Sequence, residues 1–446
     1  MAPPRPGPLR GVRSQLEAAD YVEEEHFVQG VADLFTYDGQ WNTVPLRQDV
    51  PFTTRLLVRR PTDGTGASGE TIIEPLHPSG DMASAWPRTG RTIVREGLTW
   101  IGVTQEIQGL RALKHGDADR YGDLQIPEPG LGYDMVARIA TWLRSDTSPV
   151  PGIQRLLMTG ASYTGTFQRV FIGDGFHQRA RRPDGGPAID GYLIQISSGA
   201  FMLGGYTPLS KGTPVPPSGD RRRTIQGVDV PVIEILSEGE AETHACARRP
   251  DSDAPERYRL YEVPGAAHMV AREAGPMALP VQEPPSDFPM DMLVGGALQN
   301  LRRWIADDVP PPRCDRLVLL DDRDAGPCGL RDEAQPLQRD EHGNAVSGLR
   351  TPWVDVPVAS YYPHSTPRGA DRTTEVPGGR RLGPADVADL MGCMTRFAPE
   401  KLRELYGTPA RYRELFESSL QQTLEEGWIA PTDADRARER AGEVRF

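Results

Sequence analysis

A single serine stands between two glycines in the stretch 160–165, which reads GASYTG. The apolar run QRLLMTG (154–160) leads into Ser162, and the run TFQRVFIGDGFHQR, which begins as a helix would, follows it. This pattern predicts a tight turn from a strand into a helix, where small neighbours let a serine hydroxyl project from the backbone. The first glycine fits that turn, whereas the second comes one place late and Thr164 holds the small-residue position. We expect Ser162 to be a nucleophile.

A serine nucleophile needs a base, and the base needs a carboxylate that orients it. His268, in LYEVPGAAHMV, follows the last predicted strand and is flanked by small residues. The acid is expected in SEGE (237–240), which follows the apolar run VPVIEILSE. The chain order serine, acid, histidine is the order expected for a nucleophile on such a turn. Spacing after the strand favours Glu240 and the Glu-Gly pair favours Glu238, so both stay candidates.

The negative oxygen formed during acyl transfer needs hydrogen-bond donors. The first is expected to be the backbone N–H of Tyr163, the residue after the nucleophile. The second is expected in the loop after the predicted strand ETIIEPL (70–76), at Ser79 or Gly80. His77 starts the same loop, and we expect it to line the substrate site.

The segment 200–227 interrupts the regular pattern and is too long for an ordinary connection. We interpret it as a lid-like insertion that leaves the sheet at the same edge as Ser162. Phe201 and Met202 are expected to contact an apolar acyl group. The run Arg221–Arg223 is suited to a substrate carboxylate, because guanidinium groups bind planar anions at two points.

Apolar strand-like runs alternate with helical ones along the middle of the chain. The expected strands lie at 70–76, 98–106, 154–160, 188–197, 230–238 and 257–265, and the clearest helices at 133–145 and 291–305. Such alternation predicts an α/β fold with a mostly parallel central sheet and helices on both of its faces. In these folds function gathers at the carboxyl ends of the strands, which is where Ser162 falls.

The organisation around this sheet is expected to be simple. Residues 1–17 are predicted to be disordered, and 18–446 to form a single domain that begins with extended segments. The insertion 200–227 and a C-terminal extension over 310–446, which ends in helices, complete it.

The composition of the chain argues against several classes of protein. The 446 residues carry a net charge of −12, and a nucleic-acid-binding protein would need a basic face. No run of about 18 apolar residues is present, and the N-terminus lacks the apolar stretch of a secretory signal. The four cysteines show no metal-binding spacing. We therefore expect a cytoplasmic protein with no cofactor or metal, no nucleic-acid partner and no membrane association, acting on a small acyl substrate in an oligomeric state that the sequence leaves open.

Several stretches together resemble a bacterial α/β-hydrolase-domain family of poorly defined substrate. The resemblance runs from about Tyr21 to Ala441 and rests on EEEHFVQGVADLF, LTWIGVTQEIQGL with RYGDL, TGASYTG, VPVIEILSEGE, RYRLYEVPGAAH, DEHGNAVSGLRTPWVDVPVASY and ELYGTPARYRELF. It implies an α/β-hydrolase fold, Ser162 as nucleophile, His268 as base and an acid within SEGE. The family usually has glutamine where this chain has Tyr163.

The leading hypothesis is a serine esterase-type hydrolase that cleaves an ester, lactone or thioester through a Ser-His-Glu triad and an acyl-enzyme. An acyltransferase or cyclase would use the same triad, with a different group intercepting the acyl-enzyme. A hydrolase-like binding protein without activity is the alternative from another class. All three triad residue types occur in the required order, which favours an enzyme.

Overall fold

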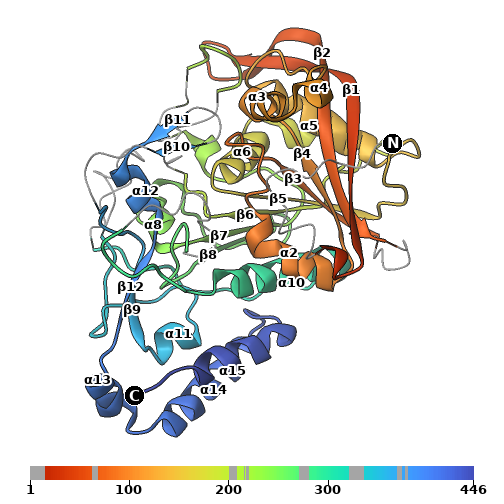
Figure 1. Cartoon of the computed structure of the whole chain (residues 1–446). Coiled ribbons are helices and arrows are strands. Elements are labelled where there is room, and N and C mark those ends of the chain that lie inside the picture. Colours follow the sequence, from red (N-terminus) through yellow and green to blue (C-terminus); the bar gives the residue numbers. More distant parts are fainter. Residues whose placement is uncertain are drawn as a thin grey trace.

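The computed structural model of the chain describes residues 16–62, 69–199, 208–214, 216, 220–270, 281–320, 336–368, 374–376 and 380–446. Its described part is built around one large twisted sheet with helices on both faces (Figure 1). Of the segment predicted to be disordered, only residues 16 and 17 are described, and Leu16 is buried there.

The sheet confirms the predicted mostly parallel arrangement. Its strands are β1 (Tyr21–Tyr37), β2 (Thr43–Pro61), β3 (Glu70–Pro75), β4 (Thr99–Val103), β5 (Arg155–Ala161), β6 (Gly191–Gln195), β7 (Val232–Leu236) and β8 (Tyr258–Glu262). They lie in the order β1-β2-β4-β3-β5-β6-β7-β8. All neighbours from β4 to β8 are parallel, and the expected N-terminal extended segments form the antiparallel strands β1 and β2. Every residue of β3, β4, β6, β7 and β8 is buried, as a sheet covered on both faces requires.

Helices cover both faces of the sheet, and further helices follow in the C-terminal extension. They are α2 (Trp86–Arg95), α3 (Ile107–Gly116), α4 (Ala118–Tyr121), α5 (Leu131–Leu143), α6 (Tyr163–Gly173), α7 (Phe176–Arg179), α8 (Glu238–Ala241), α10 (Met290–Asp307), α11 (Pro352–Asp355), α12 (Pro384–Leu390), α13 (Pro399–Tyr406), α14 (Pro409–Glu425) and α15 (Ala434–Gly442). Helices α5 and α6 pack on one face of the sheet, and α2 and α10 on the other (Figure 1). Two separate apolar cores result, one on each face, and they fix the sheet from both sides.

The C-terminal extension continues the second core and ends in helices, as predicted. Strand β9 (Ala359–Tyr362) pairs antiparallel with β12 (Cys393–Arg396), and β10 (Thr374–Val376) with β11 (Arg380–Leu382). Trp353 of α11 stacks edge-on against Phe416 of α14, and both belong to the core that α10 covers. The last helices lie below this layer, at the end of the molecule away from β1 and β2 (Figure 1).

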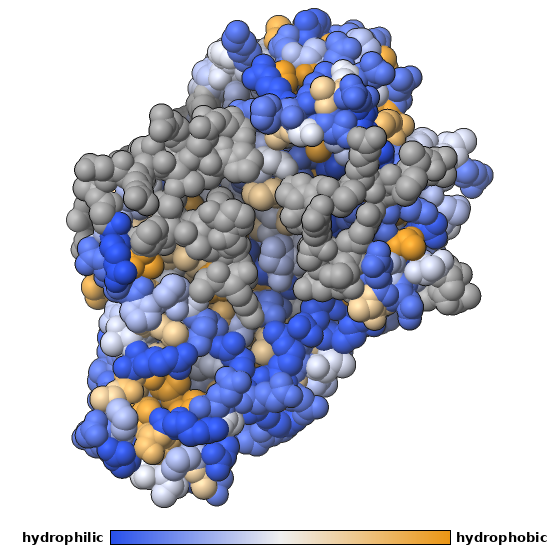
Figure 2. All heavy atoms as spheres, viewed as in Figure 1, coloured by the Kyte–Doolittle hydropathy of each residue, from blue (hydrophilic) through white to orange (hydrophobic). Residues whose placement is uncertain are grey.

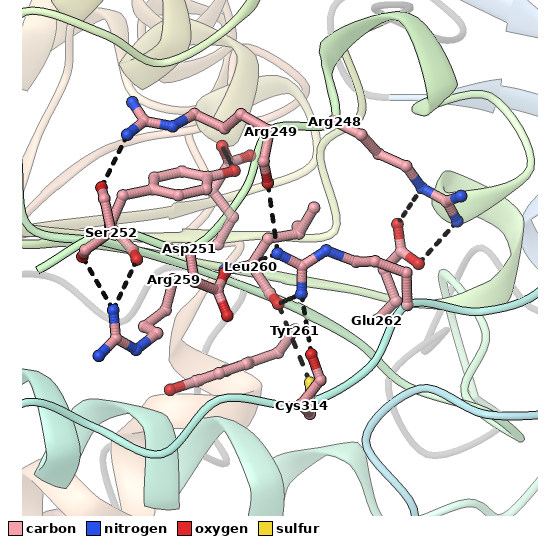
Figure 3. A network of polar contacts seen from close by, with 12 residues as sticks. Arg248, Arg249, Asp251, Ser252, Arg259, Leu260, Tyr261, Glu262 and Cys314 are labelled. Atoms are coloured by element: carbon pink, nitrogen blue, oxygen red, sulfur yellow. Dashed lines mark hydrogen bonds and ion pairs between the residues drawn. The ribbon is translucent and has the colours of Figure 1, made fainter.

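The extension also covers the outer edge of the sheet at β8. Arg316 donates to the Leu260 carbonyl at 2.5 Å and pairs with Asp251 at 2.6 Å. Arg248 forms a two-point ion pair with Glu262 at the end of β8, with both contacts at 2.7 Å (Figure 3). An uncovered edge strand would expose unpaired backbone groups. These contacts pair the Leu260 carbonyl and the Glu262 side chain of β8, the strand that leads to His268.

Candidate active site

Ser162 lies on a strained turn between β5 and α6. Its backbone angles are φ +58° and ψ −121°, a region that side-chain-bearing residues rarely adopt. The Ser162 N–H donates to the Gln195 carbonyl at 3.1 Å, which ties the turn to the end of β6. The side chain is partly exposed at the carboxyl edge of the sheet. This geometry is the strand-to-helix elbow that the sequence predicts.

Both glycines around Ser162 are required by close contacts. A Cβ on Gly160 would lie 2.6 Å from the Thr164 carbonyl oxygen. A Cβ on Gly165 would lie 2.6 Å from Ser197 Cβ, because α6 passes directly over the end of β6. The late position of the second glycine therefore reflects where the helix meets the neighbouring strand.

Hydrogen bonds explain why Thr164 occupies its position in the turn. Its Oγ1 accepts from the Ala161 N–H at 2.9 Å and contacts Ser84 Oγ at 2.8 Å. Ser84 Oγ also donates to the Ala161 carbonyl at 3.2 Å. Ser84 belongs to the loop after β3, so that loop is held directly against the elbow.

The structure brings His268 to Glu240. His268 Nδ1 and Glu240 Oε1 are 2.6 Å apart, and the other carboxylate oxygen accepts from Ser237 Oγ at 2.5 Å and from the Ser237 N–H at 3.2 Å. Burial by itself would raise the pKa of Glu240. The charge of His268 and the hydrogen bonds from His268 and Ser237 outweigh it, so the pKa lies below its ordinary value. Glu240 is thus held as an ionised acceptor for the histidine.

Glu238, the other candidate acid, has different partners. Its carboxylate accepts from Arg339 at 2.7 Å and from the Gly265 N–H at 2.6 Å. Burial raises the pKa of Glu238, although the charge of Arg339 and these hydrogen bonds oppose the rise. Glu238 therefore links the acid loop to the loop before His268 instead of contacting the histidine.

His268 is held from two sides and stays partly accessible. Arg88 of α2 donates to the His268 carbonyl at 2.7 Å, and the next residue, Met269, pairs with the chain around Met391. The His268 side chain is 11% exposed while that of Glu240 is 2% exposed, so the ring reaches the surface and its acid does not. Within the part of the chain that the structure describes, Ser162 Oγ makes no hydrogen bond to His268. Such contacts are often long before substrate binds.

The loop after β3 carries the remaining predicted residues. Tyr163 is the first residue of α6, so its N–H points from a helix N-terminus at the elbow. The N–H of Ser79 donates to His77 Nδ1 at 3.1 Å, and that of Gly80 to the Pro78 carbonyl at 2.9 Å. Each of these two amides would have to leave its acceptor to serve as the second donor, and that assignment stays a prediction.

His77 lies at the elbow. Its ring meets that of Tyr163 edge-on, with the ring centres 5.4 Å apart. Burial and, to a smaller extent, the nearby charge of His268 together lower the pKa of His77 to about 4. His77 is therefore neutral at pH 7.

Comparison with known proteins identifies the family of the chain. A family model described as "Alpha/beta hydrolase domain" matches residues 4–439. The chain belongs to this family. A search among curated proteins returns no match.

Solved structures described as esterases or hydrolases show low similarity to this chain. An esterase from the fungus Rhizomucor miehei is 14% identical, with a TM-score of 0.38, over 69% of this chain and 94% of its own. A putative dienelactone hydrolase from Klebsiella pneumoniae is 14% identical, with a TM-score of 0.32, over 63% and 99%. Brefeldin A esterase, a bacterial homologue of human hormone sensitive lipase, is 13% identical, with a TM-score of 0.30, over 51% and 67%.

The insertion differs in part from its expected role. Phe201 and Met202 lie outside the described residues. Arg222 pairs with Asp220 at 2.8 Å and with Asp174 at 3.3 Å, and the buried Arg223 donates to the carbonyls of Gly199 and Pro216. These two arginines are occupied by the protein itself, because the carboxylates of Asp220 and Asp174 and two backbone carbonyls lie beside them. The idea that the whole run faces a substrate carboxylate is wrong for these two.

A cavity of about 390 Å³ lies among the C-terminal elements. Its lining includes Trp353, Phe397, Leu402 and Tyr412, and apolar side chains gather at the surface over α13 and α14 (Figure 2). None of the residues that line it belongs to the elbow or to the acid and base loops. It is therefore separate from the candidate active site of this alpha/beta hydrolase domain. No helix in the described ranges is long and apolar enough to cross a membrane.

Sequence reasoning missed the residues that hold the site together. Ser84, Arg88 and Arg339 contact the elbow, the base and the acid loop respectively. Only Ser84 carried a signal, because it lies in the loop predicted to reach the nucleophile. Arg339 lies about a hundred residues beyond its partner, and no local pattern marks it.

Proposed function

We propose that this protein is a serine hydrolase that cleaves an ester, lactone or thioester through Ser162, His268 and Glu240. The observation that carries the proposal is the 2.6 Å contact between Glu240 Oε1 and His268 Nδ1. Both residues follow strands at the carboxyl edge of the sheet, where Ser162 occupies a strained turn. Membership of the alpha/beta hydrolase domain family supports hydrolysis.

The first step follows from the proton positions. With its Nδ1–H donated to Glu240, a neutral His268 carries a lone pair on Nε2. Ser162 Oγ attacks the carbonyl carbon, its proton passes to His268 Nε2, and the π electrons of the carbonyl move onto the oxygen. The N–H of Tyr163 stabilises this oxyanion from the start of α6.

The remaining steps of the reaction restore the free enzyme. The oxyanion reforms the carbonyl, the bond to the leaving oxygen or sulfur breaks, and the leaving group takes the proton from His268. Water then attacks the acyl group on Ser162, gives a proton to His268, and the acid leaves as Ser162 recovers its hydrogen. Glu240 stays ionised throughout and stabilises the imidazolium, a role that its lowered pKa favours.

Hydrolysis of p-nitrophenyl esters of rising chain length tests the proposal. Ser162→Ala should lose three or more decades of kcat, since removing a triad member typically costs that much. Ser145→Ala, the same change at an exposed serine on another part of the surface, should hydrolyse the esters as the wild type does. Near-native turnover by a folded Ser162→Ala protein would refute the mechanism.

A further inference from the structure

Residues 76–80, the first part of the loop after β3, offer few backbone donors to an oxyanion. Pro78 has no N–H, and every other N–H between residues 76 and 80 already has an acceptor. The pairs are Leu76 N–H to Val103 O, His77 N–H to Met82 O, Ser79 N–H to His77 Nδ1 and Gly80 N–H to Pro78 O. A second donor from this stretch is therefore most simply a side chain.

The register of the sheet puts His77 beside the nucleophile. Strands β3 and β5 are parallel neighbours, paired from Glu70 with Arg155 to Ile73 with Met158. Carried on beyond Ile73, the same register brings His77 level with Ser162. The edge-on contact of the His77 ring with Tyr163, at 5.4 Å between ring centres, agrees with this placement.

The hydrogen bond at Nδ1 decides which nitrogen of His77 can donate. Nδ1 accepts from the Ser79 N–H at 3.1 Å, and a neutral imidazole has only one N–H, so the proton is on Nε2. The pKa of about 4 keeps the ring in this neutral form at pH 7. A neutral donor also avoids repulsion with His268 when that ring takes up the serine proton.

We propose that the Nε2–H of His77 is the second oxyanion donor, opposite the N–H of Tyr163, an assignment that rests on the proposed hydrolase function. When Ser162 attacks, the carbonyl π electrons move onto the oxygen, and both donors bind the charge that develops there. When the leaving group departs, the same electrons return to the carbonyl. His77 neither gains nor loses a proton in either step, and it touches the reacting oxygen directly.

Two isosteric variants separate this role from a structural one. His77→Gln puts an amide N–H near the position of Nε2 but loses the acceptor for Ser79. His77→Asn keeps an acceptor near Nδ1 but has nothing at Nε2. If His77 is an oxyanion donor, the asparagine variant is the damaged one; if it only holds its loop, the glutamine variant is.

The measurement is the rate at which a fluorophosphonate labels Ser162 in the full chain, since that reaction also develops charge on an oxygen. His77→Asn and His77→Phe should slow labelling by about 10²- to 10³-fold, the usual loss for one oxyanion donor, while His77→Gln should stay much closer to the wild type. For an ester that is turned over, kcat should fall with KM nearly unchanged. His115→Phe, at an exposed histidine of α3, serves as the matched control.

The outcomes are distinct. Wild-type rates in His77→Asn, or a slower rate in His77→Gln than in His77→Asn, would overturn the donor role while leaving the serine mechanism intact. Failure of the wild-type protein to be labelled at Ser162 would instead overturn the proposed function, and the assignment of His77 with it.

Discussion

Ser162, the proposed nucleophile, and the proposed acid–base pair of Glu240 and His268 are held by different parts of the chain. The turn at Ser162 is fixed by segments of the sheet around it. Ser84 contacts Thr164, the Ser162 N–H bonds to the end of β6, and Arg169 of α6 donates to the Ser197 carbonyl at 2.9 Å. The nucleophile side is thus built within the first half of the chain.

The acid–base side depends on the C-terminal extension. Arg339 pairs with Glu238, and His364 contacts Glu242 at 2.8 Å just beyond the acid. The Met269 N–H donates to the Leu390 carbonyl at 2.8 Å, directly after His268. The acid and base loops therefore have outer support from Arg339, His364 and Leu390, in addition to the bond from Arg88 to the His268 carbonyl.

This difference indicates how the extension contributes to function. Damage to the elbow should disturb the nucleophile alone, because its supports are local. Damage to the extension should move the acid and the base together, at a distance from Ser162. The predictions below test each side in turn.

The largest effect is expected within the acid loop. Glu240→Gln keeps the shape of the side chain but cannot stabilise the imidazolium or fix its tautomer, so kcat should fall about 10⁴-fold. Glu238→Gln should cost far less turnover, since Glu238 contacts Arg339 and Gly265 and not the histidine. Steady-state kinetics of the two variants decides between them. A larger kinetic loss in Glu238→Gln would reverse the assignment.

The next effect concerns the support from the extension. Arg339→Met leaves the fully buried Glu238 without its cation. Because the Arg339 side chain is 24% exposed, the loss in the free energy of unfolding should lie below the about 3–5 kcal/mol that removing one partner of a fully buried pair costs. Urea denaturation measures this loss. The double variant Glu238→Gln/Arg339→Met should be more stable than Arg339→Met alone, because no unpaired charge remains. Simple additivity of the two changes would mean that the pair does not hold the acid loop.

Much of this architecture could be predicted from the sequence. The apolar runs located β3 to β8 to within a few residues. The order of Ser162, the SEGE loop and His268 in the chain pointed to the residues of the candidate site. The choice between Glu238 and Glu240 could not be made, because both lie in the four-residue helix α8. What separates them is the partner that each meets.

The missed features share a physical cause. Arg339 acts through a contact between segments about a hundred residues apart, and periodicity reports only local structure. The reason for Gly165 lies in Ser197, a residue of the neighbouring strand end. The sequence likewise predicts that the segments of β1 and β2 are extended, but no local pattern shows that they pair with each other.

On the nucleophile side, Gly165→Ala should have a moderate effect. The added Cβ would meet Ser197 Cβ at 2.6 Å, so α6 must shift and carry Ser162 and Tyr163 with it. A misplacement of about 1 Å costs up to about 100-fold in rate. Ester hydrolysis should fall by about 10- to 100-fold. Gly116→Ala, where a Cβ meets nothing within 4 Å, is the control, and equal activity of the two variants would contradict the packing argument.

The smallest effect is a pH dependence of stability that comes from His77. Its pKa lies near 4 in the folded protein and near 6.5 when unfolded, so between these values the unfolded chain binds the extra proton. This contribution to the free energy of unfolding is therefore fully present above pH 6.5 and falls as the pH drops toward 4. His77→Gln should lose less stability over that range than the wild type. Denaturation at pH 7 and pH 4.5 checks this, and parallel losses would contradict it.

The central claim, that Ser162 is the nucleophile, is tested most directly by finding the atom that a fluorophosphonate modifies. The intact protein is labelled, digested and mapped by mass spectrometry. The account predicts one phosphonylated residue, Ser162 in the peptide containing GASYTG, with labelling lost in Ser162→Ala and strongly slowed in Glu240→Gln. Label on another serine, or undiminished labelling of Ser162→Ala, would contradict the account.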